Sequence, residues 1–171
     1  MSNRVVYWDV DTQLDFVSPA GALYVGGAEY VIPEVARLNR FAQANGIPLV
    51  STMDAHAEND PEFASWPPHC IAGTLGQRKA AETLCGQIVF EKVTTDAFLN
   101  PAIEPLLREL AADKFVVYGV VTEVCVRHAA LGLLRTGAKV ELATNAIRHL
   151  TNKARDQFYA EFRDAGGVLI S

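Results

Sequence analysis

Short apolar runs rich in β-branched residues alternate with helix-like patterns along almost the whole chain. Strand-like runs are expected at 4–9, 47–52, 88–90, 115–120, 139–143 and 168–170. Helical patterns are expected at 30–45, in the segment that starts at residue 101, at 122–135 and at 151–165. Such alternation predicts an α/β fold of Rossmann-like type, a three-layer α/β/α sandwich around a mainly parallel six-stranded sheet.

The bulk properties narrow the function classes. No linker, repeat or low-complexity tract interrupts the 171 residues, so a single domain over 1–171 is expected. A net charge of -5 and a pI near 5.3 predict no nucleic-acid partner. No run approaches the roughly 18 apolar residues of a membrane helix, so no membrane partner is expected. The three cysteines, an odd number without framework spacing, indicate a reducing compartment and a cytoplasmic protein.

Candidate reactive side chains fall where predicted strands end. Asp11 follows the first strand, Asp54 and His56 follow the second, Lys92 the third and Cys125 the fourth. Because parallel sheets bind ligands at the carboxyl ends of their strands, we expect these side chains to meet at one edge.

Cys125 is the candidate nucleophile. It lies in GVVTEVCVRHAA, one turn into a helix whose expected N-cap is Thr122. The free amides and the dipole of that helix end favour a thiolate, which is the reactive form. Cys70 and Cys85 are interpreted as packing residues, because nothing in the sequence around them indicates activation.

A carboxylate and an ammonium group are expected beside this thiol. Asp11, in DVDTQLDF, can take the thiol proton and return it to a leaving amine. Lys92 would keep the Asp11 carboxylate and the Cys125 thiolate in position by electrostatic attraction. Two neighbouring carboxylates are rivals of Asp11. By alternation Asp9 lies inside the strand, and Asp15 is placed to cap the following turn.

A metal site is expected at the same edge. Asp54 and His56 are two residues apart in an extended segment, and His69 follows thirteen residues later. A carboxylate with two imidazoles suits zinc, and it also suits iron or manganese. The irregular stretch 53–78 that carries these residues is longer than most connections and contains aromatic side chains, which favours a functional segment over a disordered one.

Taken together and in order, these motifs resemble those of the isochorismatase-like cysteine hydrolases, and among them the nicotinamidases. DTQLDF resembles D-x-Q-x-D-F, with Asp11 as the catalytic aspartate, Lys92 matches the lysine, and GVVTEVCV resembles G-x-x-T-[DE]-x-C-V around Cys125. The resemblance covers essentially the whole chain. It implies the isochorismatase-like hydrolase fold and conversion of nicotinamide to nicotinate and ammonia through a cysteine thioester, a reaction of NAD salvage.

The resemblance also implies details of the site. It implies a cis peptide between Val120 and Val121, with the amides of Val121 and Cys125 forming an oxyanion hole. It places Phe16 and Trp66 on either side of a pyridine ring whose nitrogen binds the metal, so that the carboxamide faces the thiol.

The metal segment departs from a common form of the family pattern. Nicotinamidases hold their metal with D-x-H and with the histidine of W-P-x-H-C, and many read D-W-H-P-x-x-H with a further histidine. Here the segment reads DAHAENDPEF, and Asp60 stands at the position of that further histidine. We rank Glu62, seven residues before His69, above Asp60 as fourth ligand, because some relatives use a glutamate at that offset; water is the third option.

Three other functions stay open at this stage. The same machinery serves other amides, such as a carbamoylated amine, a ureido compound or biuret. Isochorismate cleavage needs an acid and neither a thiol nor a metal, so the residues at positions 125, 54, 56 and 69 argue against it. A non-enzymatic interaction module has no use for the full set of reactive residues.

A homo-oligomer is expected, with a neighbouring subunit completing the pocket.

Overall fold

The computed structural model describes residues 4–171, and its centre is a six-stranded sheet in the order β3-β2-β1-β4-β5-β6. Every neighbouring pair of strands is parallel. The strands are β1 (Val5–Val10), β2 (Leu49–Asp54), β3 (Ile88–Lys92), β4 (Lys114–Val120), β5 (Lys139–Arg148) and β6 (Val168–Ile170). The strand order reverses between β1 and β4, which is where ligands bind in open α/β sheets.

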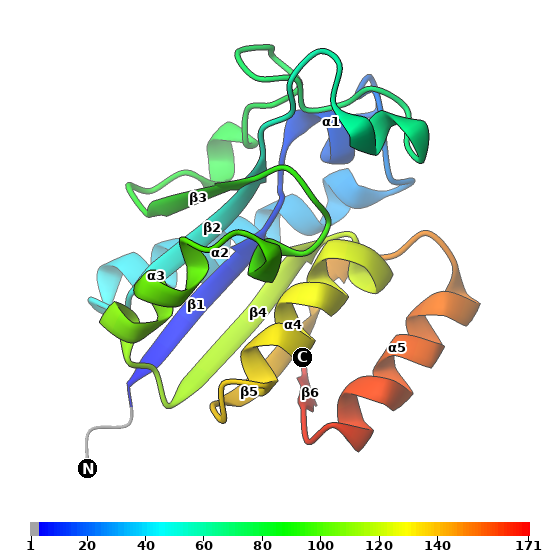
Figure 1. The fold of residues 1–171 in the computed structure, drawn as a ribbon. Coiled ribbons are helices and arrows are strands. Elements are labelled where there is room, and N and C mark those ends of the chain that lie inside the picture. Colours follow the sequence, from blue (N-terminus) through cyan, green and yellow to red (C-terminus); the bar gives the residue numbers. More distant parts are fainter. Residues whose placement is uncertain (1–3) are drawn as a thin grey trace.

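Helices cover both faces of the sheet, so the predicted three-layer α/β/α fold is confirmed. One face carries α2, and the other carries α3, α4 and α5 (Figure 1). The helices are α1 (Leu14–Val17), α2 (Ile32–Ala44), α3 (Ile103–Leu110), α4 (Arg127–Leu134) and α5 (Asn152–Asp164), with short 3-10 turns at Ala28–Val31, Pro61–Ala64, Ala81–Thr83 and Ala97–Leu99 and a π-helical turn at Thr122–Val126.

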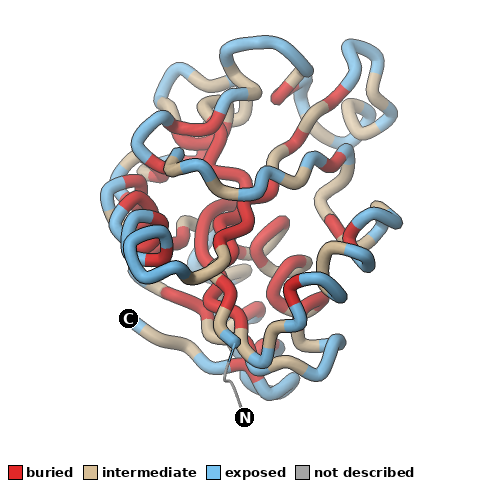
Figure 2. The backbone as a smooth tube through the Cα atoms, turned by 90° about the vertical axis from the view of Figure 1, so that its left-hand side faces the viewer, coloured by how far each residue is buried: buried red, intermediate tan, exposed pale blue. Residues whose placement is uncertain are grey.

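The helices form and pack as their apolar spacing dictates. In α2, Ile32, Val35, Ala36 and Ala42 are buried at helical intervals, while α5 buries Phe158 and Phe162 one turn apart. Figure 2 shows the resulting core: buried backbone runs through the middle of the molecule, and exposed residues occupy the outer loops. The strands that carry the candidate site are therefore packed into this core.

Several predicted boundaries were wrong in informative ways. β2 reaches Asp54 instead of ending at residue 52, because its last residues pair with β3, Asp54 opposite Lys92. β5 continues to Arg148 instead of ending at residue 143, because an irregularity in its pairing with β4 lets the strand resume beside Gly119. Thr122 does not cap a helix: it is the first residue of the π-helical turn, whose N-cap is Val121, and its buried hydroxyl has no hydrogen-bond partner among residues 4–171.

The carboxyl ends of β1 and β4 come unusually close. Gly119 has φ +116°, and a side chain there would collide with the backbone of Val10. The peptide bond between Val120 and Val121, one residue further along the chain, is cis, as the resemblance implies. The glycine therefore lets the segment that carries the candidate nucleophile approach the end of β1.

The segment 53–78 is ordered and lies across the carboxyl edge of the sheet. Oδ2 of Asp15 accepts a hydrogen bond from the Cys70 amide at 2.7 Å, and His56 forms a parallel bridge with Ile71. Asp15 therefore fastens this segment to the turn after β1, and its Oδ1 also accepts a hydrogen bond from the Ala22 amide at 2.9 Å.

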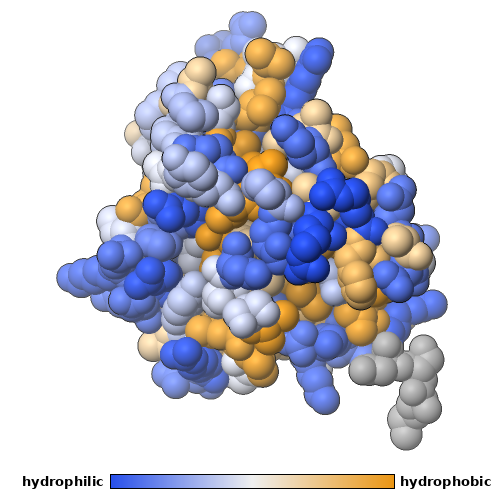
Figure 3. Space-filling model, turned by 180° about the vertical axis from the view of Figure 1, so that it is seen from behind, coloured by the Kyte–Doolittle hydropathy of each residue, from blue (hydrophilic) through white to orange (hydrophobic). Residues whose placement is uncertain are grey.

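Among residues 4–171 no helix has both the length and the apolar character to cross a bilayer. Figure 3 shows hydrophobic side chains interspersed with hydrophilic ones on the face that carries α2.

Candidate active site

Three of the predicted residues meet at the carboxyl ends of β1, β3 and β4. Nζ of Lys92 lies 2.8 Å from Oδ2 of Asp11 and 3.8 Å from Sγ of Cys125. All three side chains are buried. The thiol, a carboxylate and an ammonium group are thus in contact out of water, where charges act strongly on one another.

Asp11 owes its position to a sharp turn after β1. Its φ is +47°, an uncommon value for a residue with a side chain. The Asp11 amide donates to the Thr52 carbonyl at 3.2 Å, and the Thr52 hydroxyl donates to Oδ1 of Asp11 at 2.6 Å. The end of β2 therefore holds both the backbone and the carboxylate of Asp11.

The buried surroundings of Cys125 favour a protonated thiol over the thiolate expected from the sequence. Burial raises the pKa of the Cys125 thiol well above its usual value; Lys92 opposes this rise, and the carboxylates of Asp11 and Asp54 add to it. Burial also raises the pKa of Asp11, against the opposing charge of Lys92. A neutral thiol beside a carboxylate of raised basicity is the arrangement that proton transfer from sulfur to Asp11 requires.

Lys92 joins the thiol group to a second carboxylate. Its ammonium contacts Oδ1 of Asp54 and donates to the Thr94 carbonyl at 3.0 Å. Burial alone would lower the pKa of Lys92, but Asp11 and Asp54 outweigh it and raise that pKa above its usual value. The ammonium therefore stays charged and offsets two buried carboxylates.

Asp54, His56 and His69 form a compact group that fits a metal ion. One ligand atom from each lies within 4.8 Å of the others, and all three residues are buried. Oδ2 of Asp54 is 3.8 Å from Nε2 of each histidine. Burial would raise the pKa of Asp54, but Lys92 and the two histidines outweigh it and hold that pKa far below its usual value.

The histidine ring nitrogens are oriented as metal ligands usually are. Nδ1 of His69 lies 2.7 Å from the Pro67 carbonyl, which only accepts, so Nδ1 carries the proton and Nε2 has its lone pair free. In His56, Nδ1 faces Oδ2 of Asp60 at 3.1 Å as an ion-pair contact, and neither of the two buried ring nitrogens makes a hydrogen bond within residues 4–171. A divalent ion would satisfy both Nε2 atoms and Oδ2 of Asp54.

The two candidates for a fourth ligand lie in different places. Asp60 stands on the Nδ1 side of His56, away from the shared centre, so it orients that ring and does not face the metal group. Glu62 lines the cavity together with Asp54 and His69. Its carboxylate lies outside the compact group of three ligand atoms, so the ranking of Glu62 stays a prediction.

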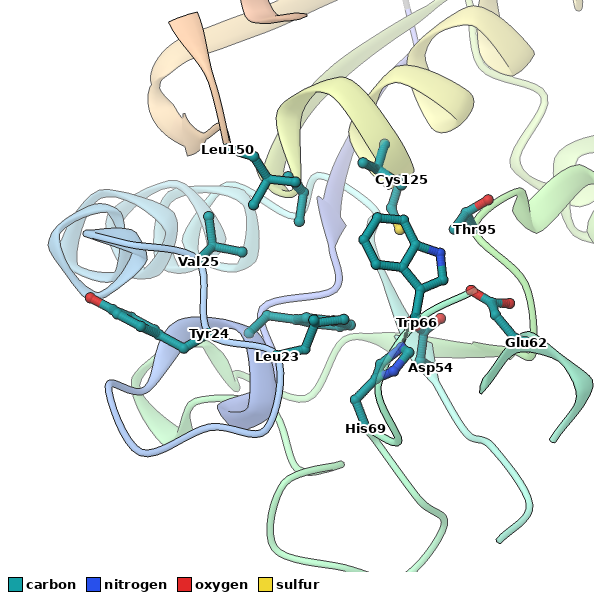
Figure 4. A pocket seen from close by; sticks show the side chains of 13 residues that line it. Leu23, Tyr24, Val25, Asp54, Glu62, Trp66, His69, Thr95, Cys125 and Leu150 are labelled. Carbon is teal, nitrogen blue, oxygen red and sulfur yellow. Dashed lines mark ion pairs between the residues drawn. The ribbon is translucent and has the colours of Figure 1, made fainter. Parts of the chain in front are cut away.

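A cavity opens directly onto the thiol and the metal group. It encloses about 440 Å³ of empty space, part of it open to solvent. In Figure 4 the sulfur of Cys125 points toward the space beside Trp66, with Asp54, His69 and Glu62 on the same side. The lining residues are Phe16, Leu23, Tyr24, Val25, Asp54, Glu62, Trp66, His69, Thr95, Val121, Val124, Cys125 and Leu150.

The aliphatic wall of this cavity was missed at the sequence level. Leu23 and Val25 come from the loop after α1, and Leu150 follows β5. No local pattern distinguishes them from core residues, because only the fold brings these segments together. Phe16 and Trp66, which were singled out, do line the cavity.

The rival residues lie elsewhere. Asp9 is buried within β1, as alternation predicts, and accepts hydrogen bonds from Thr12, Asn39 and Ser51. Cys70 is buried, and burial raises the pKa of its thiol. Cys85 lies close to the Asn39 carbonyl, 3.6 Å from its sulfur. Neither of these two cysteines lines the cavity, which agrees with their interpretation as packing residues.

Comparison with known proteins gives consistent matches. A family model described as the isochorismatase domain matches residues 9–171. The nicotinamidase/pyrazinamidase of Mycobacterium tuberculosis is 31% identical over 160 residues, 83% of each chain. The nicotinamidase of Escherichia coli is 26% identical over 199 residues, covering 95% of this chain and 92% of that protein. The pyrazinamidase of Pyrococcus horikoshii, solved in complex with zinc, superposes with a TM-score of 0.92 at 27% identity, over 98% of this chain and 99% of that chain.

Proposed function

The chain belongs to the isochorismatase family and is a nicotinamidase-like amide hydrolase, and from that premise we propose that it converts nicotinamide to nicotinate and ammonia. The observation that carries the proposal is the meeting of Cys125, Asp11 and Lys92 beside the metal group, at a cavity that Cys125, Asp54 and His69 line. The thiol supplies a nucleophile, and the metal group supplies a place for a ring nitrogen.

The first half of the reaction uses the buried thiol and carboxylate. Asp11 accepts the proton of Cys125 as the sulfur attacks the amide carbon. The amides of Val121 and Cys125 hold the resulting oxyanion. Asp11 then gives its proton to the departing ammonia, which leaves a thioester on Cys125.

The second half returns the enzyme to its starting state. A water molecule gives one proton to Asp11 while its oxygen attacks the thioester carbon. The intermediate then expels the sulfur of Cys125, which takes that proton from Asp11, and the released nicotinic acid loses its carboxyl proton to solvent to give nicotinate. Lys92 is charged when the reaction begins, because Asp11 and Asp54 raise its pKa. It therefore limits the cost of the buried negative charge.

Asp54, His56 and His69 would hold a divalent metal, and the ligand set suits zinc. When bound, the ion would supply a Lewis-acidic position for the ring nitrogen and so orient the substrate. Phe16 and Trp66 would lie against the two faces of the ring. The cavity is lined mainly by apolar and aromatic side chains, as small-molecule sites usually are, and this lining suits a flat single-ring amide.

The substrate proposal is tested by a panel of amides. Ammonia release is measured from nicotinamide, pyrazinamide, biuret and a carbamoylated amine, with zinc-loaded and with chelator-treated protein. We expect turnover of the two ring amides, and loss of that turnover after chelation. Turnover confined to biuret or the carbamoylated amine would overturn the choice of nicotinamide and favour the alternative amide hydrolases.

A further inference from the structure

The sheet opens at the candidate site because β1 ends before its neighbour β2. The last paired residues of these strands are Asp9 and Ser51, and one more backbone hydrogen bond links Asp11 to Thr52. The chain then turns away at Asp11, while β2 runs on to Asp54. On its other side Asp54 has β3 as a neighbour, but on the β1 side no strand lies beside it.

The side chain of Gln13 takes the place of the missing strand. Its Oε1 accepts a hydrogen bond from the Asp54 amide at 2.7 Å, and its Nε2 donates to the Asp54 carbonyl at 2.8 Å. Nε2 also donates to the Gln77 carbonyl at 2.8 Å. Gln13 is fully buried, so water cannot replace these bonds.

The backbone of Gln13 is itself held in place. It forms an antiparallel bridge with Lys79, and the neighbouring Ala80 amide donates to the Thr12 carbonyl at 2.8 Å. Nζ of Lys79 lies 3.2 Å from Oδ2 of Asp9, with both side chains buried. The backbone contacts therefore fix the position from which the Gln13 side chain reaches Asp54.

We propose that Gln13 is a positioning residue: it fixes Asp54 against the segment that runs from His69 to Lys79, and so presets the metal group and the contact between Asp54 and Lys92. The carboxylate of Asp54 touches Lys92 and lies 3.8 Å from Nε2 of His56 and of His69. A shift of the Asp54 backbone moves all of these contacts together. The metal part of this inference rests on the proposed function.

If Gln13 had a purely structural role, replacing it would lower stability without changing metal affinity. Any buried amide with three hydrogen bonds contributes to stability, and its loss lowers the melting temperature. Only a positioning role also weakens metal binding in the protein that remains folded. Residues that orient metal ligands typically change metal affinity about 10- to 100-fold when they are replaced.

Two replacements of Gln13 and one control separate these possibilities. Gln13→Glu keeps the size of the side chain but sets a carboxylate oxygen against two carbonyl groups. Gln13→Met has similar length and no charge, and it carries the test if the glutamate variant does not fold. Tyr118→Phe is the control, because it removes a buried hydrogen bond of 2.7 Å to Asn39 outside the candidate site.

The experiment titrates zinc into chelator-treated protein against a competing chromophoric chelator, and records melting temperatures beside it. We expect the Gln13 variants to bind zinc about 10- to 100-fold more weakly, with Tyr118→Phe unchanged. Zinc affinity within twofold of wild type in a Gln13 variant whose melting temperature has fallen overturns the proposal. If the wild type hydrolyses no amide, the proposed function fails, but the zinc titration still decides the role of Gln13.

Discussion

The ammonium of Lys92 lies 2.8 Å from the carboxylate of Asp11, and both groups are buried at the carboxyl edge of the sheet. The two residues come from strands that are not neighbours, since β2 separates β1 from β3. The pair sits beside the Cys125 sulfur and joins it to Asp54 of the metal group. The ion pair between Lys92 and Asp11 therefore connects the candidate nucleophile, Cys125, to the metal group.

Lys92→Met tests how far this ion pair supports the site. Without Lys92 two buried carboxylates lose their compensating charge, and such a loss costs about 3–5 kcal/mol of unfolding free energy. We expect urea denaturation at neutral pH to show a loss in this range and amide turnover to fall at least about 100-fold.

The matched control for this variant is Lys114→Met. Lys114 pairs with Glu141 at 3.1 Å on the surface, where an ion pair contributes at most about 1 kcal/mol. Equal losses of stability in the two variants would contradict the role given to the buried pair.

The pH profile of kcat/KM tests the state of Asp11. Asp11 must be ionised to accept the thiol proton, so activity falls as pH falls through its pKa. Because burial raises the pKa of Asp11, the acid limb should lie above pH 3.9, the usual aspartate value. The measurement uses zinc-loaded enzyme, with circular dichroism at each pH to exclude unfolding. An acid limb at or below the usual aspartate value would argue against Asp11 as the base.

Zinc affinity tests the roles given to the acidic residues near His56. Asp60 lies on the Nδ1 side of that ring, so Asp60→Asn should weaken zinc binding only about tenfold. Glu62→Gln should weaken it more, because Glu62 lines the cavity with Asp54 and His69 and is the first-ranked candidate for the fourth ligand. His69→Ala removes a ligand outright and should show the largest loss. A greater effect of Asp60→Asn than of Glu62→Gln would reverse the ranking.

Trp66→Ala tests the substrate orientation. The ring of Trp66 lines the cavity near the sulfur of Cys125 (Figure 4). Loss of an aromatic contact of about 1 kcal/mol together with buried area should raise KM for nicotinamide about tenfold or more. Tyr30→Ala is the control, since Tyr30 is 79% exposed and does not line the cavity. An unchanged KM in the Trp66 variant would exclude stacking on this residue.

Much of the fold and the reactive centre could be predicted from local patterns. Strand ends are marked by where apolar runs stop, so Asp11, Lys92 and Cys125 could be assigned to one edge before any contact was known. Their protonation could not be predicted, because it depends on burial. A helix N-terminus alone favours a thiolate at Cys125, whereas burial and two carboxylates favour the neutral thiol.

Other features depend on contacts between distant segments. Asp60 was considered only as a metal ligand, and its place behind His56 follows from the path of the loop. Gln13 lies in the quoted DTQLDF motif, yet its role needs the early end of β1, which the sequence does not mark. Leu150 reaches the cavity only because β5 continues past its predicted end. The homo-oligomer stays a prediction, which light scattering would measure.

The most direct test of the central claim compares wild type, Cys125→Ala and Cys85→Ala in the conversion of nicotinamide to nicotinate. Cys85 lies outside the cavity and serves as the matched cysteine control. We expect wild type and Cys85→Ala to release ammonia at similar rates and Cys125→Ala to show only the uncatalysed rate. Ammonia release from folded Cys125→Ala at the wild-type rate would contradict the assignment of Cys125 as the nucleophile.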